Sequence, residues 1–211
     1  EAEVVALAID MLDACGLQDY EVRIGHVGIL RDILTGLGLS EEGEPESPVA
    51  SAMRFLDKGD WDGLTELFAA SGIEPSATQS LKTLSELDGG IETLESAREI
   101  LSSMGVALDS LDDLSSLLNS LESLAPKPPS MKVNLCVARG LDYYTGMVFE
   151  VNVAELGGEG QVLGGGSYKL LHLFGLDDLD PSCGFGLGFD RVLLALESQA
   201  ERAGRIEVVP G

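Results

Sequence analysis

The sequence has few basic residues. Lysine and arginine together number 13, against 36 aspartates and glutamates, which gives a formal net charge of −23. This excess argues against a phosphate-binding surface spread over the whole chain, because the nucleic-acid backbone is itself anionic. Most carboxylates are expected to be solvated, which favours solubility and suits a salt-rich cytosol. Any contact with RNA must be local or use sequence outside this chain.

Long apolar runs and metal-ligand spacings are also missing. No stretch of about 18 apolar residues occurs, so no membrane span is expected, and we expect no signal segment at the N-terminus. The cysteines Cys15, Cys136 and Cys183 are far apart and match no Cys-x-x-Cys motif. Reduced thiols in a cytoplasmic protein are the simplest interpretation. A chain of 211 residues can hold one core and a small satellite domain.

Histidine is equally scarce, with only His26 and His172 in the chain. Neither has a second histidine or a cysteine at ligand spacing, so no metal site is predicted. Either could be catalytic, because histidine titrates near neutral pH. We interpret both as structural residues satisfied by local hydrogen bonds.

Helical periodicity fills the first part of the chain. Hydrophobic spacing predicts a helix at 3–15, a strand at 20–26 and a helix from 28 that breaks near Gly36. From residue 41 an acidic, proline-bearing linker leads into amphipathic segments without strand patterns: 49–56, 60–68, 74–87, 91–104 and 108–124. The last carries a leucine stripe. We predict a separate all-helical insert over 41–126.

One run near the C-terminal third departs from core chemistry. In order it places an apolar strand-like segment, an arginine, a glycine, a carboxylate and two tyrosines: 133–138, Arg139, Gly140, Asp142, Tyr143 and Tyr144. A buried arginine needs an anionic partner, and adjacent tyrosines favour a half-wet pocket. The alternative is a solvent-facing hairpin in which Arg139 pairs with Asp142. A second strand-like run follows at 147–153.

Two glycine-rich segments lie downstream. Gly164, Gly165 and Gly166 precede Ser167 and Tyr168, and bare glycine lets the backbone approach a ligand closely. The spacing is not that of a P-loop. A glycine-alternating strand at 184–188 then runs into a helix that carries Arg191 near its start.

In order and spacing, these three segments resemble the catalytic domain of histidyl-tRNA synthetase. The 139–144 run resembles the first histidine motif of that family, 164–168 the second in an archaeal-type variant, and 184–191 motif 3 of class II synthetases. The resemblance implies an α+β fold, with a class II synthetase-like antiparallel sheet flanked by helices. Short connections between consecutive strands independently favour antiparallel pairing.

The resemblance also implies roles for individual residues. Arg139 would be catalytic, against the α-phosphate of ATP and the substrate carboxylate, and Arg191 would bind the γ-phosphate. Tyr144 and Tyr168 would face the imidazole of histidine. The complete expectation is histidine binding by Tyr143, Tyr144, Gly164, Gly165, Gly166 and Tyr168, and ATP binding by Arg139, Gly188 and Arg191. ATP would arrive with Mg²⁺, whose ligands are not identifiable in this chain.

The domain organisation follows from the same comparison. Residues 1–40 and 127–205 would be the C-terminal part of the catalytic domain, and 206–211 the start of a truncated anticodon-binding domain. The helical insert at 41–126 is either an acidic bundle with an ordinary leucine core or a holder of the tRNA acceptor end. Its only cations are Arg54, Lys58, Lys82 and Arg98, which favours the first alternative.

The expected function is that of a fragment of histidine–tRNA ligase, which activates histidine with ATP to histidyl-adenylate and transfers it to tRNA(His). The parent protein would be a homodimer. Because motifs 1 and 2 are not found in this chain, the fragment is expected to be inactive alone. One alternative is the synthetase-like, histidine-sensing regulatory subunit of ATP phosphoribosyltransferase. Another is an interaction module that uses 41–126.

Overall fold

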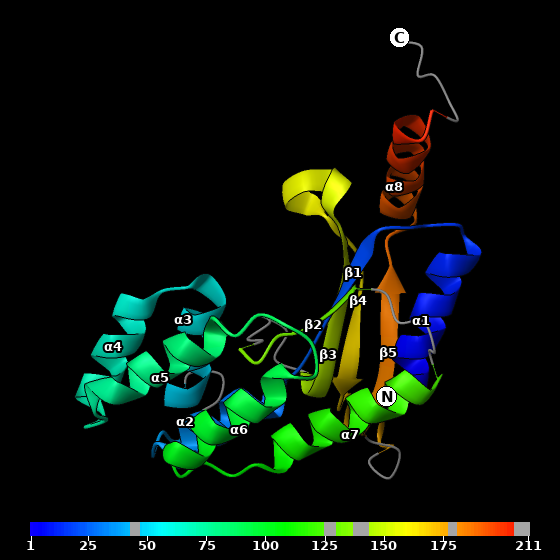
Figure 1. The fold of residues 1–211 in the computed structure, drawn as a ribbon. Coiled ribbons are helices and arrows are strands. Elements are labelled where there is room, and N and C mark those ends of the chain that lie inside the picture. Colours follow the sequence, from blue (N-terminus) through cyan, green and yellow to red (C-terminus); the bar gives the residue numbers. More distant parts are fainter. Residues whose placement is uncertain (43–46, 125–129, 137–143, 177–180, 205–211) are drawn as a thin grey trace.

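The computed structural model describes residues 1–42, 47–124, 130–136, 144–176 and 181–204 (Figure 1). Its centre is a five-stranded sheet in the order β2-β1-β3-β4-β5. The strands are β1 Tyr20–His26, β2 Ser130–Val133, β3 Tyr144–Val153, β4 Gln161–Tyr168 and β5 Ser182–Leu187. The mixed sheet and its flanking helices agree with the predicted α+β class. β2 and β5 form the two edges of the sheet.

The pairing directions confirm most of the expected antiparallel sheet and correct one part of it. β1 pairs with β3, β3 with β4, and β4 with β5 in antiparallel register. β1 and β2 are parallel, with Val22 opposite Met131. Six described helices separate these two strands in the sequence, and a long crossover is the connection that a parallel pair requires. Hydrophobic patterns identify single strands and do not show which strands pair, so they could not predict this crossover.

One face of the sheet is buried under two helices. Along β1 and β3 every second side chain is apolar and buried, as in Val22, Ile24, Phe149 and Val151. Helix α1 (Ala2–Ala14) and helix α7 (Asp109–Leu124) pack on each other and belong to the same buried cluster as this face. The predicted stripe of α7 is confirmed, since the five leucines of the stripe are buried: Leu111, Leu114, Leu117, Leu118 and Leu121.

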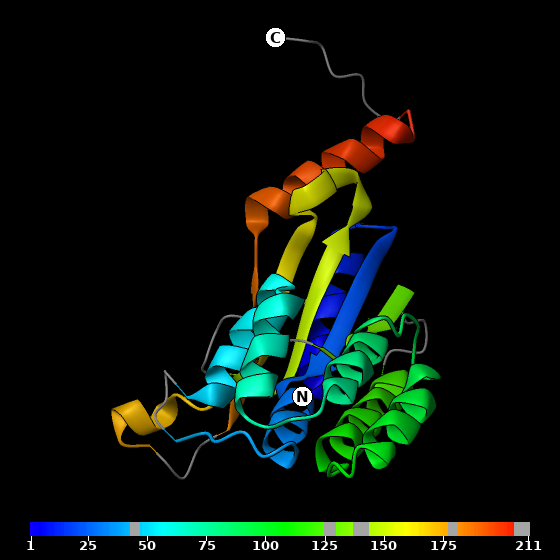
Figure 2. The same ribbon diagram turned by 90° about the vertical axis from the view of Figure 1, so that its left-hand side faces the viewer.

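The remaining helices lie to one side of the sheet (Figures 1 and 2). They are α2 Val27–Gly36, α3 Pro48–Lys58, α4 Trp61–Ala70, α5 Pro75–Ser85 and α6 Thr93–Ser103. Side-chain caps begin three of them: His26 accepts from the amide of Gly28, Ser47 from that of Ala50, and Asp60 from that of Gly63. One continuous buried cluster joins these helices to α1 and the sheet. The boundaries at 41 and 126 stay a prediction.

The strand expected at 133–138 is wrong in its first part. The strand ends at Val133, and the side chain of Asn134 accepts a hydrogen bond from the amide of Cys136 at 3.1 Å. Such an Asx turn competes with the strand pairing and redirects the chain. Residues 137 and 138 lie outside the described part of the chain.

Helix α8 (Phe189–Arg202) stands at one end of the sheet (Figure 1). Only Val192 and Ala195 of this helix are buried. Polar contacts hold its far end to the turn between α1 and β1 and to the β3–β4 connection. Gln199 accepts from the amide of Gln18 at 2.9 Å, and Arg202 forms ion pairs with Asp19 and with Glu155, at 2.6 Å for the latter.

No helix in the described part of the chain has the length and apolar character that crossing a bilayer requires. The three cysteines are free thiols, as predicted. Burial raises the pKa of the Cys136 thiol to about 12, so this thiol stays protonated at neutral pH.

Candidate functional site

The face of the sheet opposite α1 and α7, here called the polar face, carries the candidate site. Strand alternation places Arg23 of β1 opposite Glu150 of β3, Glu150 opposite Gly164 of β4, and Gly164 opposite Gly186 of β5. Charged side chains thus stand at one side of this row and bare backbone at the other. The residues between them along each strand are apolar and belong to the core. The alternation that buries those residues therefore directs Arg23, Glu150, Gly164 and Gly186 to the opposite face.

A cavity of about 640 Å³ opens on the polar face. Strands β1 and β3, the β3–β4 connection and α8 form its walls: Glu21, Arg23, Glu150, Asn152, Val153, Ala154, Gly157, Gly160, Gln161 and Arg191. Two arginines and two glutamates balance their formal charges here, although the chain as a whole is strongly acidic. The nitrogen Nδ2 of Asn152 is buried and has no hydrogen-bond partner among the described residues. The wall therefore combines cationic groups with a hydrogen-bond donor.

Arg191 lies where the sequence placed it, in the first turn of a helix that follows a glycine-rich strand. Gly188 is the residue before the first turn of α8, and its amide donates to the carbonyl of Val162 at 2.9 Å. The Nη1 of Arg191 donates to the carbonyl of Gln161, also at 2.9 Å. These two contacts tie the start of α8 to β4 and keep the guanidinium at the cavity wall.

Tyr144 and Tyr168 lie against glycines on the same face. Tyr144 and Tyr168 are register partners at the ends of β3 and β4. A Cβ added to Gly166 would lie 2.9 Å from the ring of Tyr144, and one added to Gly184 would lie 3.7 Å from the hydroxyl of Tyr168. Absence of a side chain at Gly166 is therefore what lets the Tyr144 ring lie against the sheet.

The three consecutive glycines do not form one floor, which corrects the sequence-based expectation. Gly164 and Gly166 face the polar side, whereas Gly165 faces the core side. A Cβ on Gly165 would lie 2.3 Å from the carbonyl oxygen of Gly184 and 2.6 Å from the Cβ of Phe185. Gly165 is thus required for close packing of β5 rather than for ligand access.

Four residues of the first histidine motif, Arg139, Gly140, Asp142 and Tyr143, lie outside the described residues. The expectation that Arg139 and Arg191 share a cleft therefore stays a prediction. The structure adds Arg23, which the motif search did not select. Its alternation with Val22 and Ile24 was the available signal, because it places the guanidinium on the face away from the core.

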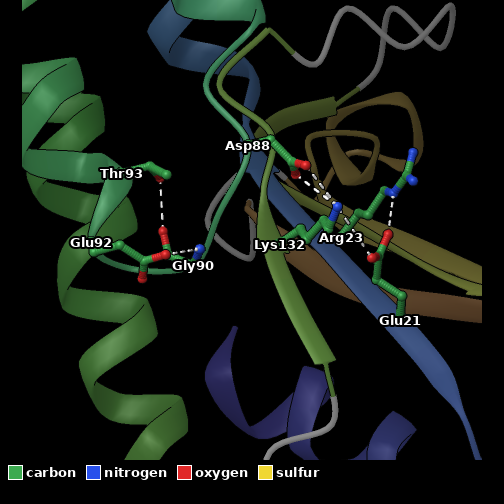
Figure 3. A network of polar contacts seen from close by, with 7 residues as sticks. All are labelled: Glu21, Arg23, Asp88, Gly90, Glu92, Thr93 and Lys132. Atoms are coloured by element: carbon green, nitrogen blue, oxygen red, sulfur yellow. Dashed lines mark hydrogen bonds and ion pairs between the residues drawn. The ribbon is translucent and has the colours of Figure 1, made fainter.

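A polar network joins Arg23 to the helical insert (Figure 3). The Nε of Arg23 donates to Glu21 at 2.7 Å, and Lys132 of β2 lies 3.6 Å from the other oxygen of Glu21. Asp88, in the α5–α6 connection, accepts from Lys132 at 2.9 Å. The hydrogen bond to Asp88 and the charge of Glu21 raise the pKa of Lys132. The amide of Val133 also donates to the carbonyl of Gly89, so this connection is fixed to the sheet edge.

His26 is structural, as predicted. Its Nδ1 accepts from the amide of Gly28 at 3.2 Å and caps the start of α2. Burial lowers the pKa of His26, so the ring is neutral at pH 7. His172 lies on the short helix η2 (Leu171–Phe174). Among the described residues, no three His, Cys, Asp or Glu side chains gather as metal ligands would.

Comparison with known proteins gives one consistent result. The sequence model described as histidyl-tRNA synthetase matches residues 1–192. Histidine–tRNA ligases of Archaeoglobus fulgidus and Methanoregula boonei are each 38% identical to the chain, over 99% and 93% of its length. These alignments cover 47% and 43% of the two relatives, so the chain spans about half the length of the curated proteins that it matches.

Solved structures agree on the fold. The histidyl-tRNA synthetase of Nostoc sp. PCC 7120 has a TM-score of 0.71 at 22% identity, over 99% of this chain and 48% of that one. A Bacillus halodurans structure described as an ATP phosphoribosyltransferase regulatory subunit/histidyl-tRNA synthetase has a TM-score of 0.72 at 27% identity, over 93% and 48%. With the family model matching most of its length, the chain belongs to the histidyl-tRNA synthetase family.

Proposed function

We propose that this chain supplies part of the histidine and ATP site of a histidine–tRNA ligase. The whole protein would activate histidine to histidyl-adenylate and transfer it to tRNA(His). The observation that carries the proposal is the polar face, where Tyr144 and Tyr168 lie against glycines at one end of the β3–β4 pair and Arg191 lines a cavity at the other end. The archaeal ligases named above support it through sequence identity.

Activation requires a carboxylate oxygen of histidine to attack the α-phosphorus of ATP while pyrophosphate leaves in line. Negative charge grows on the phosphate oxygens, so fixed cations directed at them lower the barrier. Arginine suits this task because its planar group donates two parallel hydrogen bonds and stays charged. We assign the γ-phosphate to Arg191, with Gly188 beside it, and the α-phosphate to Arg139. Mg²⁺ would accompany ATP, commonly with water and phosphate as most of its ligands.

Selection of histidine needs polar groups that match an imidazole edge. A hydroxyl left unpaired by a wrong side chain penalises binding strongly. We assign this role to Tyr144 and Tyr168, with Tyr143 in support. Gly166 leaves room for the ring of Tyr144, and we assign Gly164 to the same wall of the histidine site.

The remaining parts of the proposal concern the whole protein. We propose that the whole protein transfers histidine to tRNA(His), forms a homodimer and is located in the cytoplasm. The division into 1–40 and 127–205, the insert 41–126 and a further domain beginning at 206 is part of it as well.

Calorimetric titration of the chain with histidine tests the site. We expect binding that Tyr168→Phe weakens about tenfold, because an imidazole nitrogen loses its hydroxyl partner. Tyr20→Phe is the matched control, since its hydroxyl donates to Asp13 at 2.7 Å, away from the tyrosine pair. Equal affinity of all three proteins, or none for the unmodified chain, contradicts the assignment. Histidine-dependent ATP–pyrophosphate exchange is expected to be absent from the chain alone, and robust exchange would refute its proposed inactivity.

A histidine-sensing regulatory subunit is the second candidate. It is favoured by the likeness to the Bacillus halodurans structure, whose description names both activities. A sensor binds histidine without activating it. Incubation of the complete protein with histidine, ATP and tRNA distinguishes the two, because only the ligase forms histidyl-tRNA.

A further inference from the structure

Two guanidinium groups line the cavity on the polar face, and they come from opposite ends of the chain. Arg191 enters from α8 and Arg23 from β1. Between them lie Glu150 and Asn152 of β3. The proposed function uses only Arg191 of this pair, which leaves the second cation to be explained.

The side chain of Arg23 is prepared for an anionic ligand. It is 48% exposed, and Glu21 engages its Nε at 2.7 Å. Among the described residues, no acceptor lies within hydrogen-bond distance of its two terminal nitrogens. An arginine held by Nε keeps its outer pair of nitrogens for two oxygens of one phosphate.

Glu21 contacts Lys132 as well as Arg23, so its negative charge offsets only part of the positive charge of Arg23. Glu21 shares its charge with Lys132, 34% exposed, and Lys132 is in turn held by Asp88 at 2.8 Å (Figure 3). The four charges of this network cancel. A ligand phosphate at Arg23 would meet a cation held by Glu21, which is itself held by Lys132, in a chain that is otherwise acidic.

We propose that Arg23 is a second phosphate-binding residue of this cavity and binds the triphosphate chain of a nucleotide. Lys132 and Glu21 are the residues that position it. The proposal rests on the proposed function, because it assumes that Arg191 binds the same ligand. The buried Nδ2 of Asn152, without a partner among the described residues, supplies an uncharged donor on the wall between the arginines.

Calorimetric titration with ATP and, separately, with adenosine tests this assignment. Arg23→Gln is expected to weaken ATP binding about tenfold, in line with the loss of a hydrogen bond to a charged group at a half-exposed site. Adenosine affinity should not change, since adenosine carries no phosphate. Arg98→Gln is the matched control: it removes the same charge from helix α6, where Arg98 pairs with Asp112.

Two further variants separate ligand contact from positioning. Arg23→Lys keeps the charge but loses the planar pair of donors, so it should restore only part of the ATP affinity. Lys132→Met leaves Glu21 to pair with Arg23 alone and is expected to weaken ATP several-fold without changing adenosine affinity. A merely structural role of Lys132 would change both affinities together, which would overturn the positioning role.

The outcomes distinguish this proposal from the proposed function. If the unmodified chain binds ATP and Arg191→Gln weakens it while Arg23→Gln does not, Arg23 is not a phosphate ligand and the proposed function stands. If Arg23→Gln and Arg98→Gln lower ATP affinity equally, only the net charge matters and the assignment fails. If the unmodified chain binds no ATP, both the nucleotide site and Arg23 as its ligand are refuted for this chain.

Discussion

Substitution of Gly165 by alanine tests whether this glycine faces the core side of the sheet while Gly164 and Gly166 face the polar side. In the folded sheet the new Cβ would lie 2.3 Å from the carbonyl oxygen of Gly184 and 2.7 Å from the Cα of Phe185. Both are backbone atoms of β5, so no side-chain rotation relieves the contact. The strands β4 and β5 must separate locally, and their pairing is weakened.

The expected cost comes from comparison with other overpacked cores. Extra methyl groups in well-packed sites destabilise proteins by about 1–3 kcal/mol, and a clash with backbone falls at the upper end. A loss of about 3 kcal/mol corresponds to a melting temperature lower by about 6–12 °C for a chain of this size. Gly164→Ala differs because its Cβ would meet the amide nitrogen of the Gln161 side chain, at 2.5 Å, which can rotate away. Its expected change is below about 1 kcal/mol.

Thermal unfolding followed by circular dichroism measures both variants. Gly186→Ala serves as a control, since no atom lies within 4 Å of its added Cβ. Equal melting temperatures for the Gly165 and Gly164 variants would refute the assignment of these glycines to opposite faces. A low melting temperature for Gly186→Ala would show that glycine content, rather than the backbone clash, controls stability.

Two other perturbations probe α8 and α2. Arg202→Ala removes the ion pairs with Asp19 and Glu155 and should cost about 1–2 kcal/mol, because one oxygen of Glu155 is already buried without a partner among the described residues. Hydrogen exchange should then quicken in α8 and not in α1, and unchanged exchange in α8 would contradict the fastening of this helix. Burial lowers the pKa of His26 in the folded chain below its usual 6.5, so its contribution to stability is present above pH 6.5 and is lost as the pH falls towards the lowered value. Urea unfolding of His26→Asn, which keeps a capping side chain, should show a smaller loss between pH 7.5 and 5.5 than the unmodified chain, and parallel pH curves would contradict this.

Local periodicity predicted most of the elements because each is encoded within a few turns of chain. The leucine stripe of α7 and the alternation of β1 are examples, and both are buried as expected. The parallel pairing of β1 with β2 was not accessible in this way. It depends on where the chain returns after the helical insert, which no local pattern records.

The candidate site was predictable where a motif carried it and not elsewhere. Arg191, Tyr144 and Tyr168 were selected through their motifs; the structure shows that the two tyrosines are register partners and that Arg191 lines the cavity, and their ligand-binding roles stay predictions. Gly165 was assigned to the wrong face, because a run of identical residues hides the alternation of a strand. Arg23 was missed because Lys132, which shares Glu21 with it, is brought close by the pairing of β1 with β2 and is distant in the sequence.

The edge strand β5 has no charged side chain that would discourage pairing with another strand. Its six residues, Ser-Cys-Gly-Phe-Gly-Leu, include no charged side chain, whereas the other margin has the paired Lys132. Uncharged edges can be extended by strands of other molecules. Mutual repulsion between copies that each carry −23 opposes such stacking, and added salt weakens that repulsion over distances beyond about 10 Å. The chain should therefore stay dispersed in dilute buffer and assemble as the ionic strength rises, opposite to the salting-in of ordinary acidic proteins.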